Sequence, residues 1–328
     1  MKNVAFLVPE CADIAMLENA RYGFQVANRY LQARGDPPRF SLRLIAATAQ
    51  VRLDGGRIQV LADGVLSDTG AVDLCVVPPL QGPVADAVRA NGPLIEWLVR
   101  HHQAGGEVAS LCLGAALPAA GGLLDGQRAV VHWAARQDYA RAFPTVQWVS
   151  DRVVLAGKGI YTSGGAFSAA HLVLYLIEKY ADRVTAIWCA KYFQLDWSRQ
   201  SQLPYAVFSG DKTHADEVVR GVQDHIEGRY ADRITVDDLA DRFLLGCRTL
   251  ERRFRQATGS SVLEYLQRIR VEAAKRRLET SRETVAEVMY EVGYSDAKAF
   301  RDVFVKFSGL SPVLYRERYA KAAAGQLT

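Results

Sequence analysis

Two stretches near the end of the chain decide its organisation: RTLERRFRQATGSSVLEYLQRIRVEAAKRRLE at residues 248–279 and VAEVMYEVGYSDAKAFRDVFVKFSGLSPVLYR at residues 285–316. The second stretch repeats a pattern that begins at Thr235, with an offset of about fifty residues. Each copy has a short amphipathic segment, a turn and a second amphipathic segment, which predicts two helices packed together. Residues 262–279 keep one amphipathic pattern between the copies. We therefore expect a continuous helix that holds both copies at a fixed spacing.

The second helix of each copy combines a buried aromatic position with exposed charged residues. Around Phe254 the sequence places several cations, including Arg253 and Arg255, and the acids near Phe300 can pair with cations or accept hydrogen bonds from cytosine. Such helices can lie in the major groove of DNA. The formal charge is +4, and essentially all of this excess falls after residue 230. A helical interaction domain whose basic face is merely solvated is the alternative.

At this point a family resemblance can be given: residues 216–319 resemble an AraC/XylS-type DNA-binding domain, and the two quoted stretches carry the resemblance. It implies double-stranded promoter DNA as the partner, with two helix-turn-helix units contacting successive major grooves. RNA polymerase and a second copy of the chain, in a homodimer, are the further partners that we expect. The groove-facing residues implied by the resemblance are Arg248, Glu251 and Arg252 in the first helix and Ala297, Lys298, Arg301 and Asp302 in the second.

The earlier part of the chain alternates between short apolar runs and longer amphipathic stretches. This alternation predicts an α/β domain with a mainly parallel sheet flanked by helices, of the flavodoxin-like kind. The expected strands are 3–8, 40–46, 72–77 and 107–111, and the expected helices are 13–32, 83–103, 168–180 and 183–193. We place the α/β domain at residues 1–195, a linker at 196–215 and the all-α domain at 216–328.

Cys112 lies where a predicted strand runs directly into a helix, in GGEVASLCLGAA at residues 105–116. This is the sequence of a nucleophile elbow, in which glycines relieve the crowding of a sharp turn. We expect the helix N-terminal amides to lower the pKa of the thiol and to stabilise an oxyanion. His132 and Trp133 follow twenty positions later and can approach the thiol. A lone Cys and a lone His are, however, more often core residues.

Here a second resemblance enters. Residues 3–193 resemble the PfpI type of class I glutamine amidotransferase-like domain, most specifically in VASLCLGAALPAAGGLLDGQRAVVHW, and the whole chain resembles a GlxA-type transcriptional regulator. The resemblance implies that this domain is a sensor and that Cys112 and His132 mark its pocket. It also implies an acid after the first strand, for which Glu18 is the nearest candidate, although MLENARYGF departs from the usual pattern. The implied effector is a small nitrogenous metabolite.

Two functions stay open on the sequence alone. In the first, a metabolite binds near Cys112, His132 and Trp133 and changes how a dimer presents its DNA-binding units. In the second, the chain is a cysteine-dependent amidase or hydratase that uses Cys112 as nucleophile and His132 as base. We favour the first, because a functional triad needs an orienting group that this sequence does not clearly supply.

Composition limits the remaining classes of protein. The five cysteines are far apart and lack metal-ligand spacing, so we expect a reduced, cytoplasmic protein without a metal or another cofactor. Glu10 and Asp13 interrupt the apolar start of the chain. We therefore expect neither a signal peptide nor a membrane span.

Overall fold

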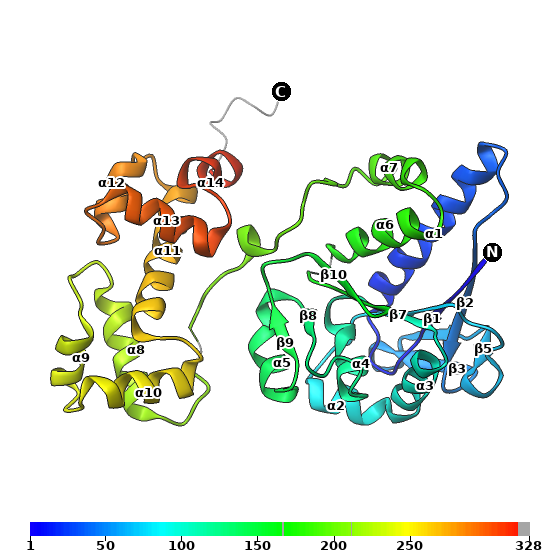
Figure 1. Cartoon of the computed structure of the whole chain (residues 1–328), viewed down its shortest axis with the longest axis horizontal. Coiled ribbons are helices and arrows are strands. Elements are labelled where there is room, and N and C mark those ends of the chain that lie inside the picture. Colours follow the sequence, from blue (N-terminus) through cyan, green and yellow to red (C-terminus); the bar gives the residue numbers. More distant parts are fainter. Residues whose placement is uncertain (166, 211, 321–328) are drawn as a thin grey trace. The chain divides into compact units, whose positions relative to one another are not determined.

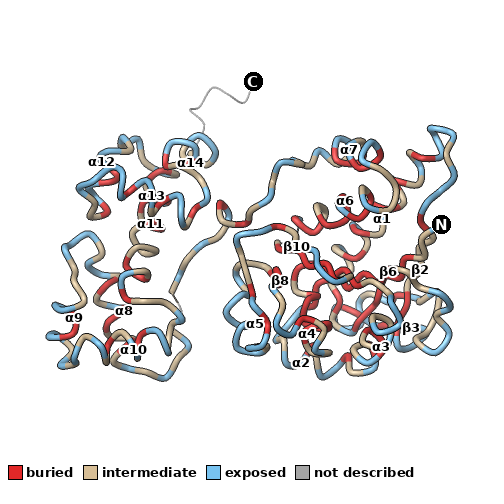
Figure 2. Tube along the Cα trace, viewed as in Figure 1, coloured by how far each residue is buried: buried red, intermediate tan, exposed pale blue. Residues whose placement is uncertain are grey.

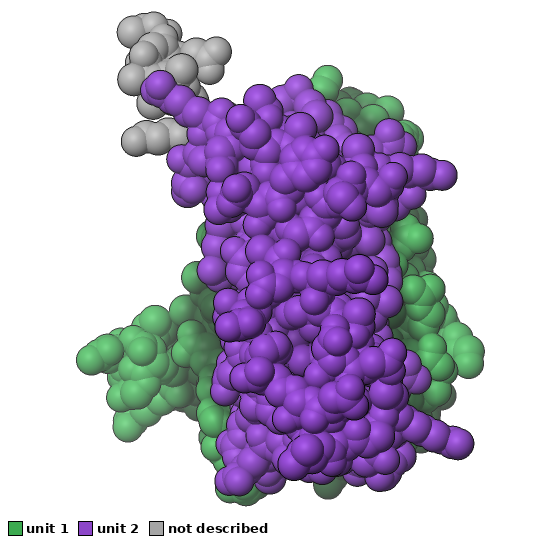
Figure 3. All heavy atoms as spheres, turned by 90° about the vertical axis from the view of Figure 1, so that its left-hand side faces the viewer, with its two compact units in different colours: residues 1–202 green, residues 203–328 purple. Residues whose placement is uncertain are grey.

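The computed structural model describes residues 1–165, 167–210 and 212–320, so the last eight residues of the expected C-terminal domain, 321–328, lie outside the described part. The chain forms two compact units, Met1–Gln202 and Leu203–Thr328 (Figure 3). The assignment of residues 196–215 as a linker stays a prediction. We describe each unit by itself.

The first unit is built on a mostly parallel sheet with the strand order β10-β11-β7-β6-β1-β2-β5. All neighbours in it pair in parallel except β10 and β11. Its strands are β1 (Lys2–Leu7), β2 (Phe40–Ala46), β5 (Gly64–Val65), β6 (Leu74–Val77), β7 (Glu107–Ser110), β10 (Val154–Gly157) and β11 (Ile160–Ser163). Two small sheets accompany it: β3 (Gln50–Leu53) with β4 (Ile58–Leu61), and β8 (Arg128–Val130) with β9 (Gln147–Val149).

Helices cover both faces of this sheet (Figure 1). One face packs against α1 (Ile14–Ala33), α6 (Ala169–Tyr180) and α7 (Arg183–Tyr192). The other packs against α2 (Val84–Ala90), α3 (Gly92–Gln103), α4 (Ala116–Ala120) and α5 (Arg136–Ala142). The apolar strand residues are buried between these layers, as expected for a parallel sheet. The predicted α/β architecture is confirmed.

One predicted helix, 83–103, is two helices separated by Asn91. The Asn91 side chain accepts a hydrogen bond from Glu10 N at 2.9 Å and donates to Glu10 O at 3.1 Å. Pro93, at the start of α3, cannot donate an amide hydrogen bond to the preceding turn. The break therefore ties these helices to the loop after β1.

Within residues 203–210 and 212–320, the second unit has one short 3₁₀ turn, Leu203–Tyr205, and its other regular elements are α-helices. These are α8 (Glu217–Arg229), α9 (Val236–Arg242), α10 (Cys247–Thr258), α11 (Val262–Thr280), α12 (Val285–Glu291), α13 (Ala297–Ser308) and α14 (Pro312–Tyr319). Two pairs, α9 with α10 and α12 with α13, are the helix-turn-helix units that the repeat predicts. The first helix of each begins with the same capping box, Thr235 with Asp238 and Thr284 with Glu287.

The continuous helix expected between the repeats is α11. Its first half, with Val262 and Tyr265, packs into the core around Phe254, and its second half, with Ala274, packs into the core around Phe304. Figure 2 shows buried positions along α11. One helix therefore belongs to both apolar cores.

Candidate functional sites

Helix α10 presents one charged face to solvent. Arg248, Arg252 and Arg255 are exposed, Glu251 is partly exposed, and Leu250 and Phe254 on the other side are fully buried. The four charged side chains line a common hollow of the surface, together with neighbours that include Gln256, Ser261 and Leu263. The helix ends at Gly259, whose φ of 72° belongs to a left-handed C-cap.

Helix α13 repeats this arrangement in the second copy. Ala297, Lys298, Arg301 and Asp302 are all exposed, while Phe300 and Phe304 are buried. The acid that precedes the helix has a local role, because Asp296 Oδ1 accepts a hydrogen bond from Ala299 N at 2.6 Å and caps the helix.

The exposed cations of the two helices share a further property. Within residues 1–165, 167–210 and 212–320, no ion pair engages Arg248, Arg252, Arg255, Lys298 or Arg301. Their charge is therefore available to a polyanion.

Arg253 differs from its neighbours and corrects one sequence-based expectation. Its guanidinium group donates to both carboxylate oxygens of Asp216, at 2.9 and 2.6 Å. Asp216 also caps α8 by accepting from Val219 N, and the guanidinium group of Arg253 lowers the pKa of this carboxyl. Arg253 is thus a structural residue that fixes α10 to α8 and not one of the available cations.

In the first unit, Cys112 occupies the sharp turn that the sequence predicts. It follows β7, begins a short 3₁₀ turn that leads into α4, and has a φ of 51°. Left-handed backbone is uncommon for a residue with a side chain and costs energy at such a turn. A Cβ at Gly114 would lie 2.4 Å from Pro78 O, so only glycine fits there. The Cys112 amide donates to Ser163 Oγ at 3.4 Å.

The pKa of the Cys112 thiol is shifted in the direction opposite to the one that the sequence predicts. Burial raises the pKa of Cys112 to about 12, and the backbone amides of Leu113 and His132, which act in the other direction, do not offset it. The predicted lowering of the thiol pKa is therefore wrong. Since only 4% of the residue is exposed, loss of hydration outweighs the turn's amides.

The His132 side chain caps the short 3₁₀ turn that follows it. Its Nδ1 accepts from Ala134 N at 3.1 Å, and its ring centroid lies 5.3 Å from that of Trp133. Burial lowers the pKa of His132. Beside the elbow, Leu113 and Tyr139 line a cavity of about 650 Å³, and Tyr139 donates to Leu113 O at 2.5 Å.

The candidate acid, Glu18, has a charged partner on its own helix. The Glu18 carboxylate is held by the guanidinium group of Arg21, with distances from 2.7 to 3.0 Å. The charge of Asp13 adds to the effect of burial in raising the pKa of Cys112. Asp13 caps α1 through Met16 N at 3.1 Å. The sequence did not connect Asp13 with the thiol, although Asp13 is the N-cap of α1, the first helix after β1.

These two units together define the class: a two-domain protein with an α/β domain of the cysteine-elbow type and a double helix-turn-helix DNA-binding domain. Residues 28–179 match the DJ-1/PfpI family and residues 239–318 match a helix-turn-helix domain family. The first unit therefore contains the DJ-1/PfpI match, and the second contains the helix-turn-helix match.

Individual relatives match only parts of the chain. The HTH-type transcriptional activator RhaS of Escherichia coli K12 is 36% identical over 87 residues, which are 26% of this chain and 31% of RhaS. A putative transcriptional regulator from Vibrio parahaemolyticus has a similar fold, with a TM-score of 0.52 and 18% identity, over 58% of this chain and 98% of that structure. An AraC family regulator from Pseudomonas putida gives a TM-score of 0.48 and 19% identity, over 59% and 100% of the two chains.

Across the described parts of both units, no helix combines the length and the apolar character that crossing a bilayer requires.

Proposed function

We propose that this chain is a transcription regulator that binds promoter DNA with α10 and α13 and responds to a small effector through its first unit. The observation that carries this proposal is the repeated presentation of exposed, unpaired cations by two helices joined through one rigid helix. The 19 residues of α11 span about 28 Å at 1.5 Å per residue. That length is comparable to one turn of DNA, about 34 Å, so the two units suit successive major grooves.

The residues have different roles in this proposal. Arg248 and Arg252 read base edges, where a guanidinium group can bond guanine bidentately, and Glu251 accepts from cytosine. In the second helix, Lys298 and Arg301 supply the corresponding contacts. Ala297 and Asp302 approach the same groove from the exposed face of α13. Arg255 neutralises phosphate, which adds affinity without sequence preference.

The first unit acts in this proposal as a sensor and not as an enzyme. A thiol whose pKa is about 12 is protonated at neutral pH, and the His132 ring accepts a backbone hydrogen bond instead of serving as its base. The region of Cys112, His132 and Trp133 is the position for a small nitrogenous effector that the family resemblance favours. A homodimer that works with RNA polymerase in the cytoplasm completes the proposal.

The test is selection of genomic fragments by the full-length chain, followed by anisotropy titration of a selected fragment and of random duplex. Arg252→Glu should weaken binding to the selected fragment by at least the 1–3 kcal/mol typical of one bidentate base contact, roughly five- to 150-fold. The control Arg220→Glu, on α8, should leave the preference intact. Equal affinity for selected and random duplex, or an unchanged footprint for Arg252→Glu, would overturn the proposal.

The salt dependence of binding gives a second measurement. If Arg248, Arg252, Arg255, Lys298 and Arg301 each met a phosphate, these five cations would contribute about −4.5 to the log–log slope per chain. Arg255→Gln should make the slope shallower by about 0.9 and weaken selected and random duplexes equally.

A further inference from the structure

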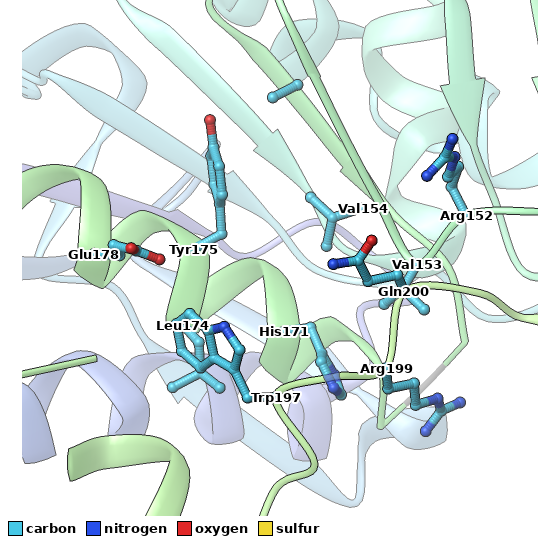
Figure 4. A pocket seen from close by; sticks show the side chains of 11 residues that line it. Arg152, Val153, Val154, His171, Leu174, Tyr175, Glu178, Trp197, Arg199 and Gln200 are labelled. Atoms are coloured by element: carbon cyan, nitrogen blue, oxygen red, sulfur yellow. The ribbon is translucent and has the colours of Figure 1, made fainter. Parts of the chain in front are cut away.

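A second cavity lies in the first unit, apart from the elbow. It has a volume of about 280 Å³, opens to the surface, and is lined by three parts of the chain: β10 with the residues before it, α6, and residues 197–200. This volume is just below the usual range for small-molecule sites, about 300–1,000 Å³, so the occupant must be small. The lining residues are Arg152, Val154, Leu174 and Trp197, among others (Figure 4). No residue of the elbow belongs to it.

The walls are held by hydrogen bonds that do not fill the cavity. Val153 N donates to Gln200 O at 2.9 Å, which fixes the 197–200 segment along the edge strand β10. His171 Nε2, on α6, is 2.8 Å from Asp196 O at the other end of this segment. The cavity is therefore a built feature between three anchored elements.

The distribution of charge indicates the chemistry of an occupant. Glu178, at one end, is paired with Arg183 at 2.8 Å, and the guanidinium group of Arg183 lies 5.9 Å from the Trp197 ring centroid. Figure 4 places Arg152 on the side away from Glu178. Arg152 is exposed, and the described residues offer its guanidinium group no ion pair. Val154, Leu174 and Trp197 supply an apolar surface between these ends.

We infer that this cavity binds a small carboxylic acid with a planar or branched apolar body. The carboxylate would pair with Arg152, since guanidinium groups bind carboxylates in a bidentate manner. The apolar body would lie against Leu174 and the Trp197 indole. A cationic ligand does not fit as well, because Arg183 already neutralises Glu178.

Occupancy of this cavity would act on the chain that leads to the DNA-binding unit. Two residues beyond its Gln200 wall, Gln202 is 1% exposed and donates to Val131 O at 3.1 Å and to Arg152 O at 3.0 Å. Gln202 is also the last residue of the first unit. The hypothesis that the cavity regulates DNA binding rests on the proposed function, whereas the binding of a carboxylic acid in the cavity does not.

The experiment measures ligand-observed NMR saturation transfer with the full-length chain, using benzoate, benzyl alcohol and benzyltrimethylammonium as probes at millimolar concentration. Benzoate should bind about tenfold more tightly than benzyl alcohol, as expected for one charge-assisted contact. Arg152→Gln should remove this preference. The matched control Arg89→Gln, on the exposed surface of α2, and Cys112→Ala at the elbow should both retain it.

Trp197→Ala provides the second variant and should weaken benzoate and benzyl alcohol alike, with thermal melting used to verify folding. Absence of benzoate binding, preference for the quaternary amine, or benzoate affinity that neither Arg152→Gln nor Trp197→Ala changes would overturn the inference. The same preparations are titrated with a selected DNA fragment. Intact DNA binding without benzoate binding would refute this inference alone, whereas loss of sequence preference would refute the proposed function.

Discussion

A buried ion pair on α11 allows one quantitative prediction about the helix that joins the two DNA-binding units. Lys275 is 3% exposed, and its Nζ donates to Glu272 Oε1 at 2.8 Å and to Ala206 O at 2.6 Å. Ala206 is among the first residues of the second unit, so Lys275 holds this initial segment against α11. The perturbation is Lys275→Met, which keeps the length of the side chain and removes its charge.

The magnitude follows from what the substitution leaves behind. Glu272 would remain buried without its partner, and burial already raises the pKa of this carboxyl despite the opposing charge of Lys275. Breaking one side of a buried pair costs about 3–5 kcal/mol, whereas replacing both sides with apolar groups is often neutral. The double variant Glu272→Leu with Lys275→Met should therefore recover most of the loss. The unpaired Ala206 carbonyl accounts for a remainder of about 1 kcal/mol.

The assay is urea unfolding of the full-length chain, followed by far-UV circular dichroism. Without the Lys275 charge, the pKa of Glu272 rises further in the variant. The deficit of Lys275→Met should be complete above that higher pKa and should shrink as the pH falls through it, because the folded variant then holds a neutral carboxyl. A deficit below about 1 kcal/mol, or a double variant as unstable as the single one, would refute the reasoning.

Three further predictions concern other parts of the chain. Thr284→Ala removes one capping box and should cost about 1 kcal/mol, with faster hydrogen exchange at the Glu287 amide as the local readout; unchanged exchange would contradict it. Arg253→Gln removes the interaction that lowers the pKa of Asp216, so it should destabilise the chain at neutral pH. Its urea midpoint should converge with that of the parent chain as the pH falls through the lowered pKa of Asp216. A constant difference between the two midpoints down to pH 2 would argue against this ion pair. At pH 7.5, Cys112 should react with iodoacetamide at least roughly a hundredfold more slowly than free cysteine, by peptide mass spectrometry, and rapid alkylation would restore the enzyme hypothesis.

Most of the fold could be predicted because it depends on local periodicity. The apolar runs at β1, β2, β6 and β7 and the repeated helix pairs are patterns within short stretches of sequence. The division of the expected helix at Asn91 was not visible, since its side chain bonds the distant Glu10 backbone. Short strands such as β5 and β8 depend on their neighbours and lack a signal of their own.

The sites were predictable in part for the same reason. The exposed face of each recognition helix follows from helical spacing, so Arg248 and Lys298 emerge from the sequence. Arg253 is not available to DNA because it pairs with Asp216, which lies 37 residues earlier in the chain and is not visible in the helical spacing. The thiol pKa and the role of Asp13 depend on how deeply Cys112 is packed, which no spacing along the chain reveals.

The shared membership of α11 in two cores has a consequence for how this half of the molecule loses its structure. Tyr265 and Ala274 belong to different apolar clusters, yet a single run of backbone hydrogen bonds connects them. Melting one cluster would expose half of a helix on which the other still relies. The pair should therefore denature as one cooperative block, and the slowest-exchanging amides of the second unit should lie near the middle of this helix.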